Sequence, residues 1–201
     1  MVNLGETSYS NNGYLGQYAK VVYNASDLTG DKPATRIRDN NGIRYYDDGE
    51  NTVVVLYPIS NDMMTVSLDS RTTEIQPYAF SYCRSLTSIT IPDSVTSIGD
   101  LAFNYCDSLT AITIPEGVTN IGSKTFSYCD GLTSITNPSS VIRIGRRAFE
   151  NCSNLASVTF ENTTGWFRTT SSTATSGTSI DVSNPETNAT NLKTTYYNSY
   201  W

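Results

Sequence analysis

Residues 73–91 read TEIQPYAFSYCRSLTSITI, and the same pattern returns every 23 residues along the chain. The three further copies are TSIGDLAFNYCDSLTAITI at 96–114, TNIGSKTFSYCDGLTSITN at 119–137 and IRIGRRAFENCSNLASVTF at 142–160. No insertion or deletion breaks the register. Identical units at a fixed period are typical of a solenoid, in which each unit buries its apolar side chains against its neighbours. The pattern therefore predicts an extended repeat surface rather than one central cleft.

Four positions of the unit hold the same or a closely similar apolar residue in every copy. They are Phe80, Phe103, Phe126 and Phe149; Cys83, Cys106, Cys129 and Cys152; Leu86, Leu109, Leu132 and Leu155; and Ile89, Ile112, Ile135 and Val158. Equivalent residues of stacked units lie over one another, so we expect each set to form a column in the core.

Each unit also contains a short segment that is predicted to be a strand. The pattern Leu-x-x-Ile-x-Ile, at 109–114 in the second copy, alternates with period two and is rich in β-branched residues. A matching segment begins at Met63, so five strand rungs are expected. A second apolar pair follows, such as Val118 and Ile121, and then a short helical turn is expected to carry the phenylalanine.

These residues resemble the BspA-type leucine-rich repeat, a family of bacterial and protist surface proteins. The resemblance rests on Ala-Phe-x-x-Cys-x-x-Leu-x-x-Ile-x-Ile-Pro-x-x-Val-x-x-Ile-Gly from Ala79 to Gly99 and on its copies downstream. It implies a β-rich α/β solenoid with a parallel strand ladder. For some members it also implies adhesion to host proteins or to other cells. The family has no shared catalytic residues to carry over, and its ligands vary.

Three segments are predicted to form one structural unit. Residues 1–62 are an N-terminal flank ending in a β-hairpin cap, 63–160 are the solenoid of one partial and four full repeats, and 161–201 are a C-terminal cap. The hairpin is predicted from the apolar runs on either side of Asp48-Gly49, a favoured turn pair. The helix of the second cap is predicted from Asn184-Pro185-Glu186, a typical helix start.

Composition argues against several classes of function. The sequence has no histidine, which removes the usual general base and the commonest metal ligand. Its 13 basic residues form no stripe of the kind that nucleic acid requires, and the cluster of Arg143, Arg146 and Arg147 is interpreted as a solvated face. No apolar run is long enough to span a bilayer. We therefore predict no enzymatic activity, no cofactor, no nucleic-acid binding and no transmembrane segment; oligomerisation is left open.

The cysteines and one acidic turn are the only groups that suggest metal binding or disulfides. A spacing of 23 residues does not match the closely paired ligands of zinc sites, and equivalent residues of stacked rungs project in parallel, which disfavours disulfides. We interpret the cysteines as buried free thiols. The acidic segment 47–51 does not match a calcium loop and is interpreted as the hairpin turn. No metal site is predicted.

Two sets of surface residues are candidates for ligand binding. One is a row of tyrosines next to the cysteine column, Tyr82, Tyr105 and Tyr128. The other is the outward side of the strand rungs, which carries Ser88, Thr90, Thr113, Ser134 and Thr136. Tyrosines suit recognition because they offer contact area at a small entropic cost. Each set has a purely structural alternative: the rings cover neighbouring turns, and the hydroxyls keep an exposed sheet face polar.

The favoured hypothesis is a binding or adhesion module, extracellular or at the cell surface, that recognises a protein or glycan through its solenoid surface. The amino terminus lacks the charged and apolar regions of a secretory signal. That observation motivates an alternative function, a structural subunit of a phage particle or of an extracellular assembly. A subunit of a phage particle would be virion-associated. A third hypothesis is a binder of ice or polysaccharide surfaces that uses the Ser/Thr ladder.

Overall fold

The computed structural model describes residues 37–47, 49 and 52–201. Most of the predicted N-terminal flank and part of the turn at 47–51 lie outside the described residues. Arg38–Trp201 form one compact unit. No helix among the described residues is both long and apolar enough to cross a membrane.

An antiparallel hairpin precedes the repeats, as predicted. Its strands are β2 (Ile43–Asp47) and β3 (Val53–Pro58), and β1 (Ile37–Asn40) lies next to β2 in the same sheet. β2 pairs with β3 from Ile43 opposite Pro58 to Asp47 opposite Val53. Ile43 and Tyr45 alternate with more exposed residues and are fully buried, so one face of β2 packs on the core.

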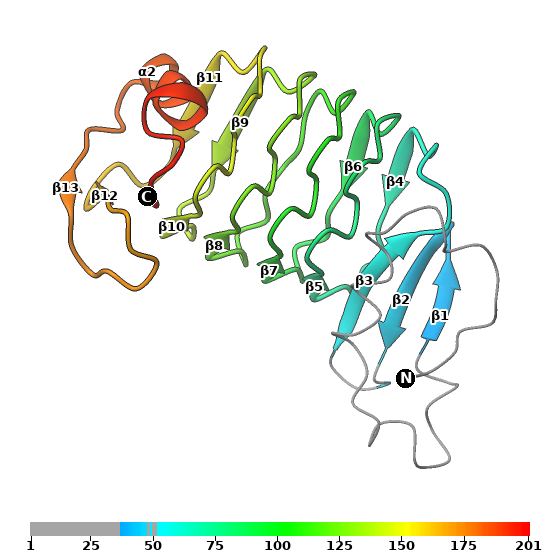
Figure 1. The fold of residues 1–201 in the computed structure, drawn as a ribbon. Coiled ribbons are helices and arrows are strands. Elements are labelled where there is room, and N and C mark those ends of the chain that lie inside the picture. The colour runs from blue at the N-terminus through cyan, green and yellow to red at the C-terminus, as the bar shows by residue number, and fades with distance from the viewer. Residues whose placement is uncertain (1–36, 48, 50–51) are drawn as a thin grey trace. The chain divides into compact units, whose positions relative to one another are not determined.

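The first ladder of the solenoid consists of short parallel strands one repeat apart (Figure 1). They are β4 (Thr65–Ser67), β6 (Ser88–Thr90), β9 (Ser134–Asn137) and β11 (Ser157–Phe160). The strand predicted at 109–114, between β6 and β9, is reduced to a single parallel bridge from Ala111 to Ser88. The predicted solenoid with its 23-residue period and parallel ladder is confirmed. Inward Val66 and Ile89 are buried while their neighbours on the strand are exposed, which is the alternation that the sequence indicated.

A second ladder forms where the sequence predicted only an apolar pair. Its strands are β5 (Glu74–Ile75), β7 (Ser97–Ile98), β8 (Asn120–Ile121) and β10 (Arg143–Ile144). With the hairpin they make a seven-stranded sheet in the order β1-β2-β3-β5-β7-β8-β10. β3 pairs in parallel with β5, so the hairpin sheet continues into the repeats (Figure 1). Two-residue strands are too short to show a period-two pattern in the sequence.

The prediction of a short helical turn in each unit is wrong. In the second unit the chain makes tight turns instead, in which Ala102 N–H donates to Gly99 O (3.3 Å) and Cys106 N–H to Phe103 O (3.2 Å). Leu101 and Tyr105 adopt φ of 56° and 58°. These left-handed residues interrupt any helix, because a right-handed helix requires negative φ throughout.

The four predicted columns form the core. Adjacent phenylalanine rings of the first column stack with centroids 5.4, 5.6 and 5.4 Å apart. In the cysteine column, Cys106 Sγ donates to Phe80 O at 3.2 Å, and Cys129 and Cys152 repeat this contact one and two units later. These three thiols each bond a carbonyl of the preceding repeat, whereas Cys83 Sγ donates to Asn61 Oδ1 at 3.8 Å. All four cysteines are buried and free.

The C-terminal segment packs on the last repeat. It contains β12 (Phe167–Arg168), β13 (Thr178–Ser179), α2 (Pro185–Thr190) and the π-helical turn η4 (Asn191–Thr195). α2 begins as predicted, because the Asn184 side chain accepts the Thr187 N–H at 2.8 Å and Pro185 needs no donor. Asn188 donates to Val158 O, which ties the helix to β11 (Figure 1).

Arg143, Arg146 and Arg147 hold this segment and are not the solvated face predicted for them. Arg146 and Arg147 both donate to the side chain of Asn198. The Arg143 guanidinium lies 5.2 Å from the ring centroid of Tyr200. Sequence reasoning missed this role, because their partners lie more than fifty residues away and no local pattern marks them.

Asn137 is the irregular member of the core, and its replacement should stabilise the protein. Its side chain is 1% exposed, and neither amide atom has a hydrogen-bond partner among the described residues. The equivalent residue one repeat earlier is Ile114, also buried. We expect Asn137→Ile to raise the free energy of unfolding by about 1–3 kcal/mol, because burying an unpaired amide is unfavourable. Urea unfolding measures the change.

The reverse change, Ile114→Asn, is the matched control and should destabilise by a similar or larger amount. An Asn137→Ile variant no more stable than the parent would mean that the amide is hydrogen-bonded in solution.

The cysteine column should be inert in the native protein. Burial raises the pKa of Cys83 and that of Cys152 to about 12, and it raises the pKa of Cys106 and Cys129 as well. Thiolate, the reactive form, is therefore scarce at neutral pH. We expect a thiol reagent at pH 8 to label four groups after denaturation and none within minutes before it, as counted by mass spectrometry. Rapid labelling of the folded chain would contradict a buried column.

Candidate functional site

Tyr82, Tyr105 and Tyr128 form a continuous stack along the repeats. Their ring centroids are 4.7 and 4.3 Å apart, with planes inclined by 11° and 9°. All three side chains are half-buried. The faces of the Tyr105 ring are covered by its two neighbours, so the column presents ring edges and hydroxyls outward. We call these three residues the tyrosine column.

The backbone of each tyrosine is left-handed. The φ angles are 63°, 58° and 61° for Tyr82, Tyr105 and Tyr128, and Asn151 has 57° at the same position of the last repeat. Asparagine tolerates this conformation better than other non-glycine residues, whereas tyrosine incurs roughly 1–2 kcal/mol of strain. Stacking of the rings therefore offsets a backbone strain energy that asparagine would largely avoid.

Charged side chains flank one end of the column. The Arg84 guanidinium lies 5.9 Å from the Tyr82 ring centroid and 5.6 Å from that of Tyr105, and it pairs with Asp107 at 3.4 Å. Desolvation and a hydrogen bond with Tyr128 raise the pKa of Tyr105. Desolvation also raises the pKa of Asp107, although Arg84 opposes it. The surface thus combines aromatic edges, hydroxyls, a cation and a carboxylate.

The predicted hydroxyl face exists as two rows on the first ladder. Ser88, Thr90, Thr113, Ser134 and Thr136 are all exposed. Thr90 pairs with Ser67 in register, and Ser134 and Thr136 pair with Ser157 and Thr159. Neighbouring rungs of such a ladder are about 4.8 Å apart, so hydroxyls repeat at that spacing. Four of these residues lie on β6 and β9 and Thr113 lies in the equivalent segment of the second repeat, whereas the tyrosines lie on tight turns. The two candidate sets therefore occupy different segments of each unit.

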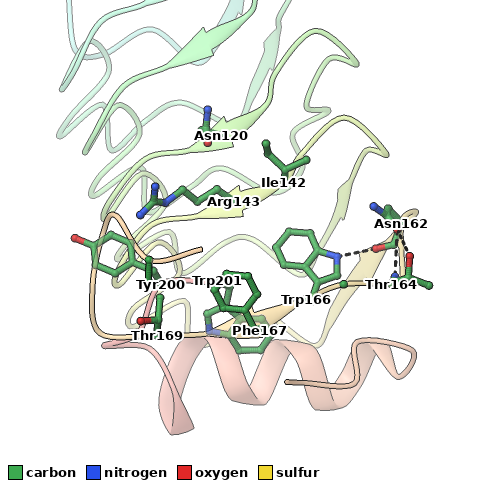
Figure 2. Close-up of a pocket in the computed structure, with 12 residues that line it drawn as sticks. Asn120, Ile142, Arg143, Asn162, Thr164, Trp166, Phe167, Thr169, Tyr200 and Trp201 are labelled. Carbon is green, nitrogen blue, oxygen red and sulfur yellow. Dashed lines mark hydrogen bonds between the residues drawn. The ribbon is translucent and has the colours of Figure 1, made fainter. Parts of the chain in front are cut away.

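A cavity at the C-terminal segment was not foreseen from the sequence. It measures about 320 Å³, and its lining includes Asn120, Arg143, Trp166, Tyr200 and Trp201 (Figure 2). The Trp166 indole donates to Asn162 O at 2.8 Å, which fixes its ring at the cavity wall (Figure 2). The lining residues span 120–201, and only the fold brings them together. Among the described residues, no group of three or more Cys, Asp or Glu side chains is arranged to hold a metal ion.

Several solved structures resemble this chain. A leucine-rich repeat protein of T. pallidum is 25% identical, with a TM-score of 0.51 over 60% of this chain and 70% of the other. One from Bacteroides capillosus is 24% identical, with a TM-score of 0.54 over 63% and 99% of the two chains. The pneumococcal vaccine antigen PcpA is 20% identical, with a TM-score of 0.59 over 66% and 32%.

These likenesses establish the leucine-rich repeat fold, and this chain spans about a third of PcpA. No curated protein matches the sequence. The model of the BspA type leucine rich repeat region matches residues 62–200 in six copies, which covers the solenoid and the C-terminal segment. With the 23-residue period, two parallel ladders and repeated core columns already described, this match shows that the chain belongs to the BspA-type leucine-rich repeat family.

Proposed function

We propose that this protein is a non-enzymatic binding or adhesion module that acts outside the cell and recognises a protein or glycan through the tyrosine column. The observation that carries the proposal is the left-handed backbone at Tyr82, Tyr105 and Tyr128. Asn151 occupies the same position in the last repeat, so the turn itself does not require a tyrosine there. A recognition role accounts for them, because tyrosine is enriched in binding surfaces.

The form of the column suggests how it binds. Equivalent side chains repeat at the period of the solenoid, so a ligand makes several similar contacts and no single one dominates. The ring faces are used in stacking, which leaves ring edges and hydroxyls for the ligand. Arg84 and Asp107 add charged groups beside the first two rings. An extended protein segment or a glycan chain that lies along the repeats matches this arrangement.

The remaining assignments belong to the same proposal. The exposed residues Ser88, Thr90, Thr113, Ser134 and Thr136 are the alternative binding face. We divide the chain into the flank 1–62 with its hairpin cap, the solenoid 63–160 and the C-terminal cap 161–201. Location at the cell surface or in the extracellular space is supported by family membership and by the resemblance of the repeats to surface proteins.

Replacing the three tyrosines together should abolish most binding with little effect on stability. We use Tyr82→Asn, Tyr105→Asn and Tyr128→Asn, since asparagine at Asn151 shows that the fold accepts it there. Each change loses stacking of about 0.5–1.5 kcal/mol and relieves strain of similar size, so the melting temperature should change little. Binding is measured against arrays of extracellular-matrix proteins and glycans and against whole cells.

Single tyrosine variants should each weaken binding modestly, and the triple variant should weaken it far more. The matched control is Thr90→Ala with Thr113→Ala and Thr136→Ala, which leaves the tyrosines intact. Loss of binding in this control, with the tyrosine variant unaffected, would move recognition to the hydroxyl face. A ligand that binds all variants equally would show that neither the tyrosine column nor the hydroxyl face is its binding site.

A further inference from the structure

Two neighbouring cavities lie where the last repeats meet the C-terminal segment, and Tyr200 lines both. The first, of about 320 Å³, contains Arg143 and Trp166 (Figure 2). The second, of about 360 Å³, is lined by Ser123, Lys124, Arg146, Arg147 and Tyr200. Each reaches the size of small-ligand pockets, roughly 300–1,000 Å³. We call the two cavities together the junction groove.

The groove is positively charged in a chain whose net charge is −6. Four cations line it: Lys124, Arg143, Arg146 and Arg147. Two carboxylates contact these walls, since Glu150 pairs with Arg147 at 3.8 Å and Asp100 accepts the Ser123 N–H at 2.7 Å. Positive charge therefore exceeds negative charge here, and the local field favours an anion.

Two of the cations retain their hydrogen-bonding capacity. Arg146 and Arg147 are engaged by Asn198. Arg143, by contrast, makes no hydrogen bond or ion pair with any described residue, and its guanidinium lies over the ring of Tyr200. Lys124 likewise has no ion pair within the described part of the chain. A guanidinium with free N–H groups is suited to a carboxylate, which it binds through two parallel hydrogen bonds.

The other walls suit a sugar. Tyr200 provides aromatic surface next to the largely buried Trp166 ring, Asn120 and Thr169 provide an amide and a hydroxyl, and Ile142 at the rim is 70% exposed. Aromatic rings with a few polar groups match the apolar C–H faces and hydroxyls of a pyranose. A peptide that binds by strand addition fits less well, because that mode requires an unpaired strand edge. The nearby backbone is already paired, Thr169 with Tyr200 and Ile144 with Trp201.

We propose that the junction groove binds a carboxylate-bearing polysaccharide, with Arg143 and Lys124 holding the carboxylates of neighbouring sugar units. The site is separate from the tyrosine column, so evidence against one of the two proposals does not count against the other. Binding should weaken as salt concentration rises, because part of the attraction is electrostatic.

The test is isothermal titration of the full chain with three carboxylated polysaccharides: polygalacturonate, polymannuronate and hyaluronate. We expect saturable binding of at least one, and loss of that binding when its carboxylates are methyl-esterified. Arg143→Gln and Lys124→Gln should each reduce the affinity about tenfold or more, the usual effect of losing a hydrogen bond to a charged group. Thermal unfolding of both variants verifies that they remain folded.

The matched control is Arg71→Gln, which removes one positive charge just before the first full repeat, where Arg71 pairs with Asp47. This variant and the triple tyrosine-to-asparagine variant should bind the polysaccharide like the parent. The proposal is overturned if none of the three polysaccharides binds, if the methyl ester binds equally well, or if Arg71→Gln weakens binding as much as Arg143→Gln. Equal binding of polyaspartate would show that charge alone is recognised and would overturn the assignment to a sugar.

Discussion

Backbone hydrogen bonds between residues one repeat apart are the constraint on which the rest of this structure depends. In the second unit Phe103 N–H donates to Thr125 O at 2.9 Å and Tyr105 N–H to Ser127 O at 3.0 Å. These groups are buried and would be costly to leave unpaired. One inserted residue would shift every later donor away from its acceptor, so the period stays fixed. The columns of phenylalanine, cysteine and leucine follow from that register.

The same constraint explains the C-terminal segment. The last repeat has donors and carbonyls that a following repeat would satisfy, and this segment satisfies several of them instead. Arg147 N–H donates to Tyr197 O, Ile144 and Trp201 exchange backbone hydrogen bonds, and Lys193 Nζ donates to Leu155 O at 2.6 Å. A segment of different shape cannot fill the space of a repeat, and the cavities at this junction are the result.

Sequence reasoning predicted the features that a side-chain pattern marks and missed those that no such pattern marks. Core columns and strand rungs follow from apolar periodicity, and the start of α2 follows from Asn184 and Pro185. The left-handed turns were missed because tyrosine and leucine are not residues that signal positive φ. For the candidate site, the row of tyrosines was predictable from its spacing, whereas its face-to-face stacking was not. The cavity lined by Asn120, Arg143 and Trp201 depends on contacts between distant segments, which no local pattern records.

The arginines of the last repeat have a consequence for how such arrays evolve. Arg146 and Arg147 fit Tyr197 and Asn198, and the corresponding residues of the preceding repeat are Ser123 and Lys124. A duplicated terminal repeat would place a second arginine pair where no such partners exist, while a duplicated internal repeat would simply extend the columns. Gene duplication can therefore lengthen this protein by copying an internal repeat. The final repeat is expected to be inherited as a single copy together with the segment that follows it.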